Sequence, residues 1–199
     1  AQSPDEMSGW QPAAAVGQSS LVQAYESGFA AHDITVAQVL LTHADLANTE
    51  RCNNARAALG ALIELNVVPV INENDTVATE EIRFGDNDNL AALVVELVSA
   101  DLLVILTDQE GLYDKDPRSN GDALLISEGA VSDKQLKSYA GSSSSLGCGG
   151  MITKLEAAEY VARLGVSTVI AGGSLQSVLL KILRGEAVGT FLDAGKRSA

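Results

Sequence analysis

The feature that most constrains the fold of this chain is a helical pattern that runs directly into an uninterrupted apolar strand. Between residues 90 and 98, apolar side chains recur at positions i, i+3, i+4, i+7 and i+8, which is the spacing of one helix face. The next run, Leu-Leu-Val-Ile-Leu at 102–106, has no polar alternation, which is typical of a strand buried on both faces of a parallel sheet. Because such a sheet must be covered on both sides, the pair predicts an α/β fold.

Three more strands and three more helices are expected from the same kinds of pattern. The strand candidates are 34–42, 67–71 and 166–170, and Pro69 weakens the second of them. The helix candidates are 12–31, 45–66 and 151–164. Strand and helix alternate along the chain, which indicates a mostly parallel sheet covered by helices. Sheets of this kind bind ligands beyond the carboxyl ends of their strands, so the loops after the strands are expected to carry the function.

Charge and composition argue against several classes of protein. The 199 residues contain 13 Lys and Arg against 26 Asp and Glu, and the net charge of −13 disfavours a nucleic-acid or anionic-membrane binder. The longest apolar stretch, 90–106, is interrupted by Glu96 and Asp101, so no membrane-spanning helix is expected. Cys52 and Cys148 cannot form a disulfide framework, which fits a reducing compartment and predicts a cytoplasmic protein.

The first candidate ligand site consists of two clusters of Asn and Asp side chains. Asn-Glu-Asn-Asp at 72–75 follows one expected strand, and Gly-Asp-Asn-Asp-Asn at 85–89 precedes the strongest helix pattern. One of Asn87, Asp88 and Asn89 is expected to cap that helix by accepting from a free backbone N–H group. Capping needs only one such side chain, so the surplus predicts a ligand. Carboxylates accept from an ammonium group and carboxamides donate to a carboxylate, so the two clusters suit a polar zwitterion.

The second candidate site follows the strand expected at 102–106. Thr107 and Asp108 lie at the carboxyl end of this strand, where side chains are well placed to touch a ligand. The stretch 114–121 is rich in turn-forming residues and is interpreted as a surface loop. His32 and His43 are too isolated in the sequence to form a metal site or to act as a general base, so no metal-ligating cluster is predicted.

The third candidate site is a stretch rich in glycine and serine, 141–150, which leads into the helix expected from Met151. A glycine-rich loop at a helix N-terminus leaves backbone N–H groups free and lets a phosphate approach them. Lys154 in the first helical turn is unfavourable by about 0.3–1 kcal/mol unless an anion is bound there. The stretch is therefore either a phosphate-binding loop, although not a Walker A loop, or a flexible linker. Cys148 has no neighbouring histidine and is not expected to be a nucleophile.

Five motifs resemble those of the glutamate 5-kinases, a family of the amino-acid kinase superfamily. They are Val-Pro-Val-Ile-Asn-Glu-Asn-Asp at 68–75, Gly-Asp-Asn-Asp-Asn-Leu at 85–90, Leu-Thr-Asp-Gln-Glu-Gly-Leu-Tyr at 106–113, Asp-Pro-Arg-Ser-Asn at 116–120 and Gly-Gly-Met-Ile-Thr-Lys at 149–154. Each motif alone is a weak signal, but the combination is specific. The resemblance extends from about Ala13 to Leu192.

The resemblance implies a fold, a reaction and an assembly. The fold is a three-layer αβα sandwich around a mostly parallel sheet, with a catalytic domain over residues 1–192 and a frayed tail over 193–199. The reaction is the transfer of the γ-phosphoryl group of ATP, with Mg²⁺, to the side-chain carboxylate of L-glutamate. The product, L-glutamyl 5-phosphate, belongs to the first step of proline biosynthesis. The family also implies a homo-oligomer, either a dimer or a tetramer; the charge balance described above argues against a nucleic-acid or a membrane partner.

The resemblance also implies roles for individual residues. Asp75 and Asn87 are similar to the pair that binds glutamate, with Asn74 and Asp86 beside them. Asp88 resembles the carboxylate that organises the catalytic lysines, and Lys154 resembles the lysine that neutralises charge on the transferring phosphoryl group. The implied ATP-binding residues are Thr107, Asp108, Cys148, Gly149, Gly150, Met151, Ile152, Thr153 and Lys154. Because a carboxylate acceptor is already ionised at neutral pH, no general base is required.

Three departures from the family pattern leave alternatives open. The sequence does not contain the family's first strand with its Lys-x-Gly-[Ser/Thr] phosphate loop, nor the following Ser-Gly-Ala loop, so it is expected to start after both. Cys148 stands where the family often has Thr, and the sequence stops near the linker to the PUA domain that many members carry. One alternative is an inactive remnant that binds nucleotide or glutamate or acts only in an oligomer. The other is a kinase of the same fold with a different acceptor.

Overall fold

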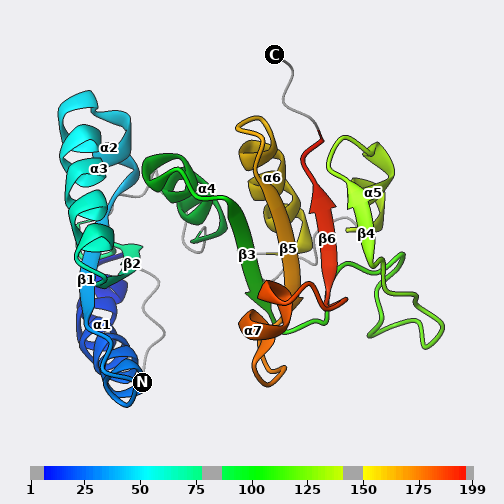
Figure 1. Cartoon of the computed structure of the whole chain (residues 1–199), viewed down its shortest axis with the longest axis horizontal. Helices are drawn as coiled ribbons and strands as arrows, with labels where there is room; N and C mark the ends of the chain where they lie inside the picture. Colours follow the sequence, from blue (N-terminus) through cyan, green and yellow to red (C-terminus); the bar gives the residue numbers. More distant parts are fainter. Residues whose placement is uncertain (1–6, 78–86, 141–149, 196–199) are drawn as a thin grey trace. The chain divides into compact units, whose positions relative to one another are not determined.

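The computed structural model describes residues 7–77, 87–140 and 150–195 (Figure 1). The chain divides into two compact units, Ala1–Leu90 and Ala91–Ala199. Both units contain helices and parallel strands, which confirms the expected α/β class. The single catalytic domain expected over residues 1–192 stays a prediction. No helix in the described part of the chain is both long enough and apolar enough to cross a membrane.

The first unit contains a two-stranded parallel sheet and the helices around it. Its elements are α1 (Met7–Ala30), β1 (Val36–Leu41), α2 (His43–Ala47), α3 (Thr49–Glu64) and β2 (Val68–Glu73). β1 and β2 pair in register along their whole length, from Val36 opposite Val68 to Leu41 opposite Glu73. α1 runs beside this sheet in Figure 1. Both strands therefore end at the same level, and the loops that follow them begin at one edge of the sheet.

Local sequence determines where the helices of the first unit begin and end. Thr42 and Asp45 form a capping box at the start of α2, in which the Asp45 carboxylate accepts from the Thr42 backbone N–H at 2.9 Å. Asn48 ends α2 and caps α3, because its side chain accepts from the Arg51 backbone N–H at 3.0 Å. The single helix expected over 45–66 is therefore wrong: the region forms two helices, which meet at Asn48.

The second unit contains a four-stranded, mostly parallel sheet. Its elements are α4 (Asn87–Val98), whose first residues belong to the first unit, β3 (Leu102–Thr107), β4 (Glu128–Ala130), α5 (Lys134–Tyr139), α6 (Met151–Ala162), β5 (Ser167–Gly172), α7 (Val178–Leu183) and β6 (Thr190–Asp193). The strand order is β3, β5, β6, β4. β3 is parallel to β5 and β4 is parallel to β6, whereas β5 and β6 are antiparallel.

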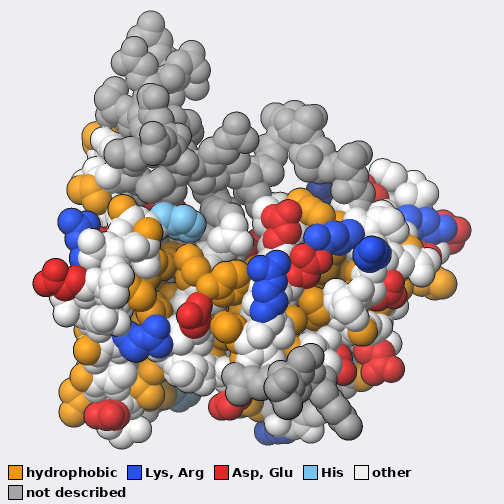
Figure 2. Space-filling model, turned by 90° about the horizontal axis from the view of Figure 1, so that it is seen from above, with side chains coloured by type: hydrophobic (Ala, Val, Ile, Leu, Met, Phe, Trp, Pro, Cys, Tyr) orange, Lys and Arg blue, Asp and Glu red, His pale blue; other side chains and the backbone are white. Residues whose placement is uncertain are grey.

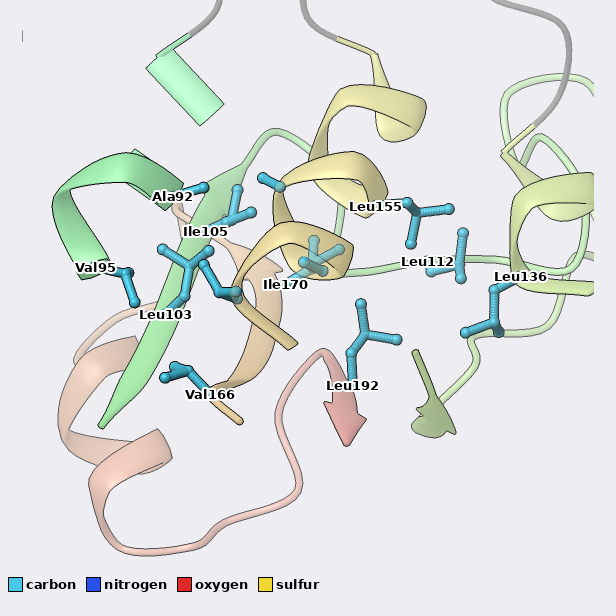
Figure 3. Close-up of a cluster of buried hydrophobic side chains, with 13 residues drawn as sticks. Ala92, Val95, Leu103, Ile105, Leu112, Leu136, Leu155, Val166, Ile170 and Leu192 are labelled. Atoms are coloured by element: carbon cyan, nitrogen blue, oxygen red, sulfur yellow. The ribbon is translucent and has the colours of Figure 1, made fainter. Parts of the chain in front are cut away.

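Helices cover both faces of the four-stranded sheet. The first apolar cluster, drawn in Figure 3, joins one face to α4, α5 and α6. It consists of Ala92, Val95, Leu103, Ile105, Leu112, Leu136, Leu155, Ala157, Ala158, Val161, Val166, Ile170 and Leu192. The second cluster joins the other face, which includes Leu102 and Val104, to α7 through Val178. Because alternate residues of β3 enter different clusters, the strand is buried on both faces, as its uninterrupted apolar sequence predicts.

All four expected strands are present, as β1, β2, β3 and β5. Pro69 fits inside β2, because among the described residues β2 pairs with β1 alone and keeps one edge free for a residue without an N–H group. Tyr25 in α1 is 46% exposed, and its ring stacks on that of Phe29 with a centroid distance of 6.5 Å.

The surface carries charges of both signs. On the face seen in Figure 2, Lys and Arg side chains lie beside Asp and Glu side chains, and apolar side chains are visible between them. Some of these charges form ion pairs, such as Lys137 with Glu159 at 2.8 Å. Several cations of the described residues thus lie next to carboxylates, in keeping with the net charge of −13.

Candidate functional site

Asn74 and Asp75 lie in a turn directly after β2. The Asn74 backbone N–H donates to the Leu41 carbonyl at 2.9 Å, and the Asn74 carbonyl accepts from the Val77 N–H at 3.1 Å. The turn is therefore attached to the last residue of β1, at the carboxyl ends of both parallel strands. Asp75 is partly buried, and this burial raises the pKa of its carboxyl group above 3.8. A buried carboxylate of this kind gains from a cationic partner such as an ammonium group.

Asn72, two residues before this turn, binds a residue that the sequence reasoning missed. Its side-chain amide nitrogen, Nδ2, donates to Oε1 of Gln18 in α1 at 2.8 Å. Gln18 and Asn72 are 54 residues apart in sequence. The only sequence signal for Gln18 is its place on the inward side of the α1 pattern, in line with Ala14 and Val22.

Asn87 and Asp88 form the beginning of α4. Asn87 is exposed and Asp88 is partly buried. α4 begins at Asn87, at the edge of the described residues, so the residue that caps it stays a prediction. Asp86 itself, which we expected beside the substrate, lies outside the described residues.

Thr107 and Asp108 lie where β3 ends, as predicted, and form a hydrogen-bonded unit. The Thr107 hydroxyl donates to the Asp108 carboxylate at 3.1 Å, and the Thr107 carbonyl accepts from the Gly173 N–H at 2.8 Å. The second Asp108 oxygen accepts from Nη2 of Arg118 at 2.8 Å. Both side chains of this ion pair are largely exposed, so it holds the Asp108 carboxylate in place more than it stabilises the fold.

The loop after Asp108 is tied to β6 by a buried threonine. The Thr190 hydroxyl accepts from the Leu112 N–H at 2.8 Å and donates to the Ile126 carbonyl at 2.6 Å. Gly111 allows this approach, because a Cβ there would come within 2.7 Å of the same hydroxyl oxygen. The segment between Leu112 and Ile126 is therefore anchored at both ends.

The tip of that segment, 114–121, is a turn-rich surface loop as expected. The Asp116 carboxylate accepts from the Arg118 backbone N–H at 2.9 Å, which is the local hydrogen bond that makes Asp favourable in turns. The sequence reasoning gave this loop no role near the strand end. Its Arg118 side chain nevertheless donates a hydrogen bond to Asp108. The sequence signal for Arg118 was its place in the Asp-Pro-Arg motif at 116–118.

The start of α6 has the properties of an anion-binding site. The helix begins at Met151, as predicted, and its N-cap is Gly150, which makes no side-chain capping hydrogen bond. The first turn contains no acidic residue but does contain Lys154, and a Cβ on Gly150 would meet nothing within 4 Å. A helix N-terminus without a side-chain cap, with its positive dipole end and a lysine in its first turn, favours a bound phosphate. Cys148 and Gly149, which we expected in this loop, lie outside the described residues.

The described residues contain no group of three His, Cys, Asp or Glu side chains that would hold a metal ion by themselves. Mg²⁺ in kinases does not need such a group, because it is bound by substrate phosphates, water and one or two carboxylates. Asp88, a partly buried carboxylate in the first turn of α4, is a residue of the type that could hold a Mg²⁺ ion brought in by a nucleotide. His32 and His43 are exposed and lie at the ends of helices, as isolated surface histidines.

Three comparisons relate the chain to known proteins. The family model described as the amino acid kinase family matches residues 3–172. The chain is 57% identical to a protein named glutamate 5-kinase from Pseudomonas aeruginosa, over 98% of this chain and 54% of that protein. It is 58% identical to another of that name from Chromohalobacter salexigens, over 92% of this chain and 48% of that protein. The chain thus spans about half the length of the curated relatives it matches.

Crystal structures of similar fold come from kinases with other names. The isopentenyl phosphate kinase of T. acidophilum has a TM-score of 0.57 and 18% identity over 87% of this chain and 66% of that chain. The UMP kinase of Bacillus anthracis has a TM-score of 0.56 and 13% identity over 82% of this chain and 60% of that chain. At these identities the similarity shows the fold alone. Together with the family match over residues 3–172, it shows that the chain belongs to the amino acid kinase family.

Proposed function

We propose that this chain is the catalytic part of a glutamate 5-kinase. The enzyme transfers the γ-phosphoryl group of ATP to the side-chain carboxylate of L-glutamate and releases L-glutamyl 5-phosphate and ADP. The observation that carries the proposal is the 57% identity to the Pseudomonas aeruginosa glutamate 5-kinase over 98% of the chain. The same proposal includes a catalytic domain over residues 1–192, a cytoplasmic location, a homodimer or homotetramer, and the first step of proline biosynthesis.

The substrate L-glutamate is bound by the polar residues after β2 and at the start of α4. Asn74, Asp75, Asp86 and Asn87 form this set, which combines carboxylates for the ammonium group with carboxamides for the carboxylates of glutamate. Asp75 is the most specific of them, because burial raises its pKa and a bound ammonium group offsets the cost of its charge. An acidic amino acid supplies that ammonium group together with two carboxylates.

ATP is bound by two segments of the second unit. Thr107 and Asp108 after β3 contact the nucleotide, and the residues from Cys148 to Lys154 hold its phosphates. The capless start of α6 supplies backbone N–H donors, and Lys154 supplies a positive charge for the transferring phosphoryl group. Phosphoryl transfer depends on in-line positioning and charge neutralisation, so the chain needs neither a nucleophile nor a base for an ionised carboxylate acceptor.

Mg²⁺ belongs to the proposed reaction as the ion that enters with ATP and neutralises charge on its phosphates. Asp88 is the carboxylate that we assign to this ion. Asp88 is partly buried in the first turn of α4, where the positive end of the helix favours an ionised carboxylate.

The proposal is tested by measuring which phosphoryl acceptor the protein uses. We would measure ADP release by the 199-residue chain, and by a chimera in which this chain replaces the matched region of the Pseudomonas aeruginosa protein. ADP release by the chimera is expected with L-glutamate but not with L-aspartate, UMP or isopentenyl phosphate. Release with one of the other acceptors would show a different kinase. No release, beside an active Pseudomonas aeruginosa parent, would show an inactive remnant.

A further inference from the structure

Gln18 in α1 has a hydrogen-bonding group that no described residue pairs with. Its Oε1 atom accepts from Nδ2 of Asn72 at 2.8 Å. Its Nε2 atom is buried and has no hydrogen-bond partner among the described residues. An unpaired buried donor costs about 1–3 kcal/mol, and native proteins rarely retain one without a reason. The N–H group therefore indicates an acceptor other than the described residues, such as a bound ligand.

The position of Gln18 places this donor at the expected substrate site. Among the less exposed residues of α1, Ala14, Gln18 and Val22 recur at helical spacing, so the Gln18 side chain lies on the face of α1 turned toward the sheet. Asn72, its partner, is the next-to-last residue of β2. The turn that carries Asn74 and Asp75 follows immediately. Gln18 thus reaches the carboxyl end of β2, where a parallel sheet binds its ligands.

The chemistry of this region favours an anionic oxygen as the missing acceptor. The sequences of α1, of β2 and of the turn through Val77 contain no Lys or Arg. A carboxylate that contacts only these segments is therefore bound by neutral donors, and carboxamide N–H groups are among them. Glu73 and Asp75 repel a carboxylate, so a donor held in a fixed orientation is needed to offset that repulsion. The hydrogen bond from Asn72 fixes the Gln18 amide in this way.

We propose that Gln18 is a substrate-binding residue whose Nε2–H group donates a hydrogen bond to a carboxylate oxygen of the acidic amino acid, while Asn72 holds the other amide atom of Gln18. The inference rests on the proposed function and adds a residue from outside the five sequence motifs. It also predicts specificity: a substrate with a carboxamide in place of the bound carboxylate loses a charge-assisted hydrogen bond.

The sharpest test is Gln18→Glu, which keeps the shape of the side chain and an oxygen to accept from Asn72 but replaces the free donor with a carboxylate oxygen. Gln18→Met provides an uncharged variant of similar size, and Gln23→Ala provides a control at an exposed glutamine of the same helix. Calorimetric titration with L-glutamate, L-glutamine and L-isoglutamine would be carried out on the 199-residue chain and on the chimera, after thermal unfolding has verified that each variant is folded.

Three results are expected. Gln18→Glu and Gln18→Met weaken L-glutamate binding at least about tenfold, the value for a hydrogen bond to a charged group. Gln23→Ala leaves the affinity unchanged. L-Glutamine and L-isoglutamine each have a carboxamide in place of one carboxylate of L-glutamate. The ligand that lacks the carboxylate bound by Gln18 has the same affinity for wild type and for Gln18→Met.

Other results would overturn the inference. Unchanged affinity in Gln18→Met, or an equal loss for all three ligands, would mean that Gln18 only supports the fold. Tighter L-glutamate binding by Gln18→Glu would mean that this amide faces the ammonium group. If neither wild-type protein binds L-glutamate, the proposed function itself is wrong and the inference fails with it.

Discussion

At the scale of single residues, the charge of Asp75 is expected to lower the stability of the fold and to favour the binding of L-glutamate. Burial raises the pKa of its carboxyl above 3.8, so the ionised group costs folding free energy at every pH above the folded pKa. This cost disappears as the pH falls through the folded pKa, because the native state then binds the proton. Asp75→Asn removes the charge and keeps the shape of the side chain. We expect it to be more stable than wild type in urea at pH 7, with a difference that shrinks in acid.

The same substitution is expected to impair function. In the chimera, Asp75→Asn should raise the KM for L-glutamate at least about tenfold while the KM for ATP stays within a factor of two, since it removes a charge that pairs with ammonium. Asp101→Asn, at an exposed carboxylate, serves as the control for both measurements. An Asp75→Asn protein that is no more stable than the control at pH 7, or that raises both KM values equally, would contradict the role of Asp75.

Substitutions of Gly150 and Lys154 are expected to impair phosphate binding or transfer more than they destabilise the fold. A Cβ at Gly150 would meet nothing within 4 Å and its φ is −96°, so Gly150→Ala should lower the free energy of unfolding by no more than about 1 kcal/mol, the cost of Ala at an N-cap. The added methyl group should nevertheless keep phosphates from the N–H groups of α6 and raise the KM for ATP. Lys154→Ala should lower kcat by at least about a hundredfold, the loss found when a charge-stabilising donor is removed.

The control for these two variants is Gly121→Ala. The new Cβ would also meet nothing within 4 Å, but Gly121 lies in the surface loop 114–121 and not at the start of α6. Urea unfolding and steady-state kinetics with varied ATP would be measured on all three proteins. If Gly150→Ala has the same KM for ATP as Gly121→Ala, the start of α6 does not bind the nucleotide.

At the scale of elements, Thr190 joins β6 to the loop that follows β3. Thr190→Val has nearly the same shape but leaves the buried Leu112 N–H and the Ile126 carbonyl without their partner. We expect a loss of about 1–3 kcal/mol of unfolding free energy for the buried N–H group alone. Thr190→Ser keeps the hydroxyl and should be markedly more stable than Thr190→Val. Equal urea midpoints for the two variants would show that the methyl contacts of Thr190, and not its hydrogen bonds, hold the loop.

How well an element could be predicted depended on its length and its burial. β3 and α6 were evident, because an apolar run of several residues and a helical repeat both require many consistent side chains. β4 and α2 have 3 and 5 residues, too few for any periodic pattern. The antiparallel β6 was also missed, because its sequence, Thr-Phe-Leu-Asp, is short and only alternately buried. Residues at strand ends, such as Asp108, followed from the strands, whereas Gln18 and Arg118 reach the site by tertiary contacts that no local pattern contains.

At the scale of the whole molecule, the two compact units divide the proposed tasks. The first unit carries the carboxylates and carboxamides proposed for glutamate, and the second carries the strand end and helix start proposed for ATP. The charge distribution follows the same division. Lys154 lies in the second unit at the proposed phosphate site, whereas α1 and β2 in the first unit contain no Lys or Arg. This separation predicts that substitutions in each unit change the KM of one substrate more than that of the other.

The central claim is that the chain supports formation of an acyl phosphate on L-glutamate. The most direct measurement compares the ADP released by the chimera with the glutamyl phosphate trapped as its hydroxamate by hydroxylamine, in the presence of ATP, Mg²⁺ and L-glutamate. We predict equal amounts of the two products, and neither product when L-glutamate is omitted. ADP release without hydroxamate, or at the same rate without L-glutamate, would contradict the claim, because the phosphoryl group would then be passing to water and not to a carboxylate.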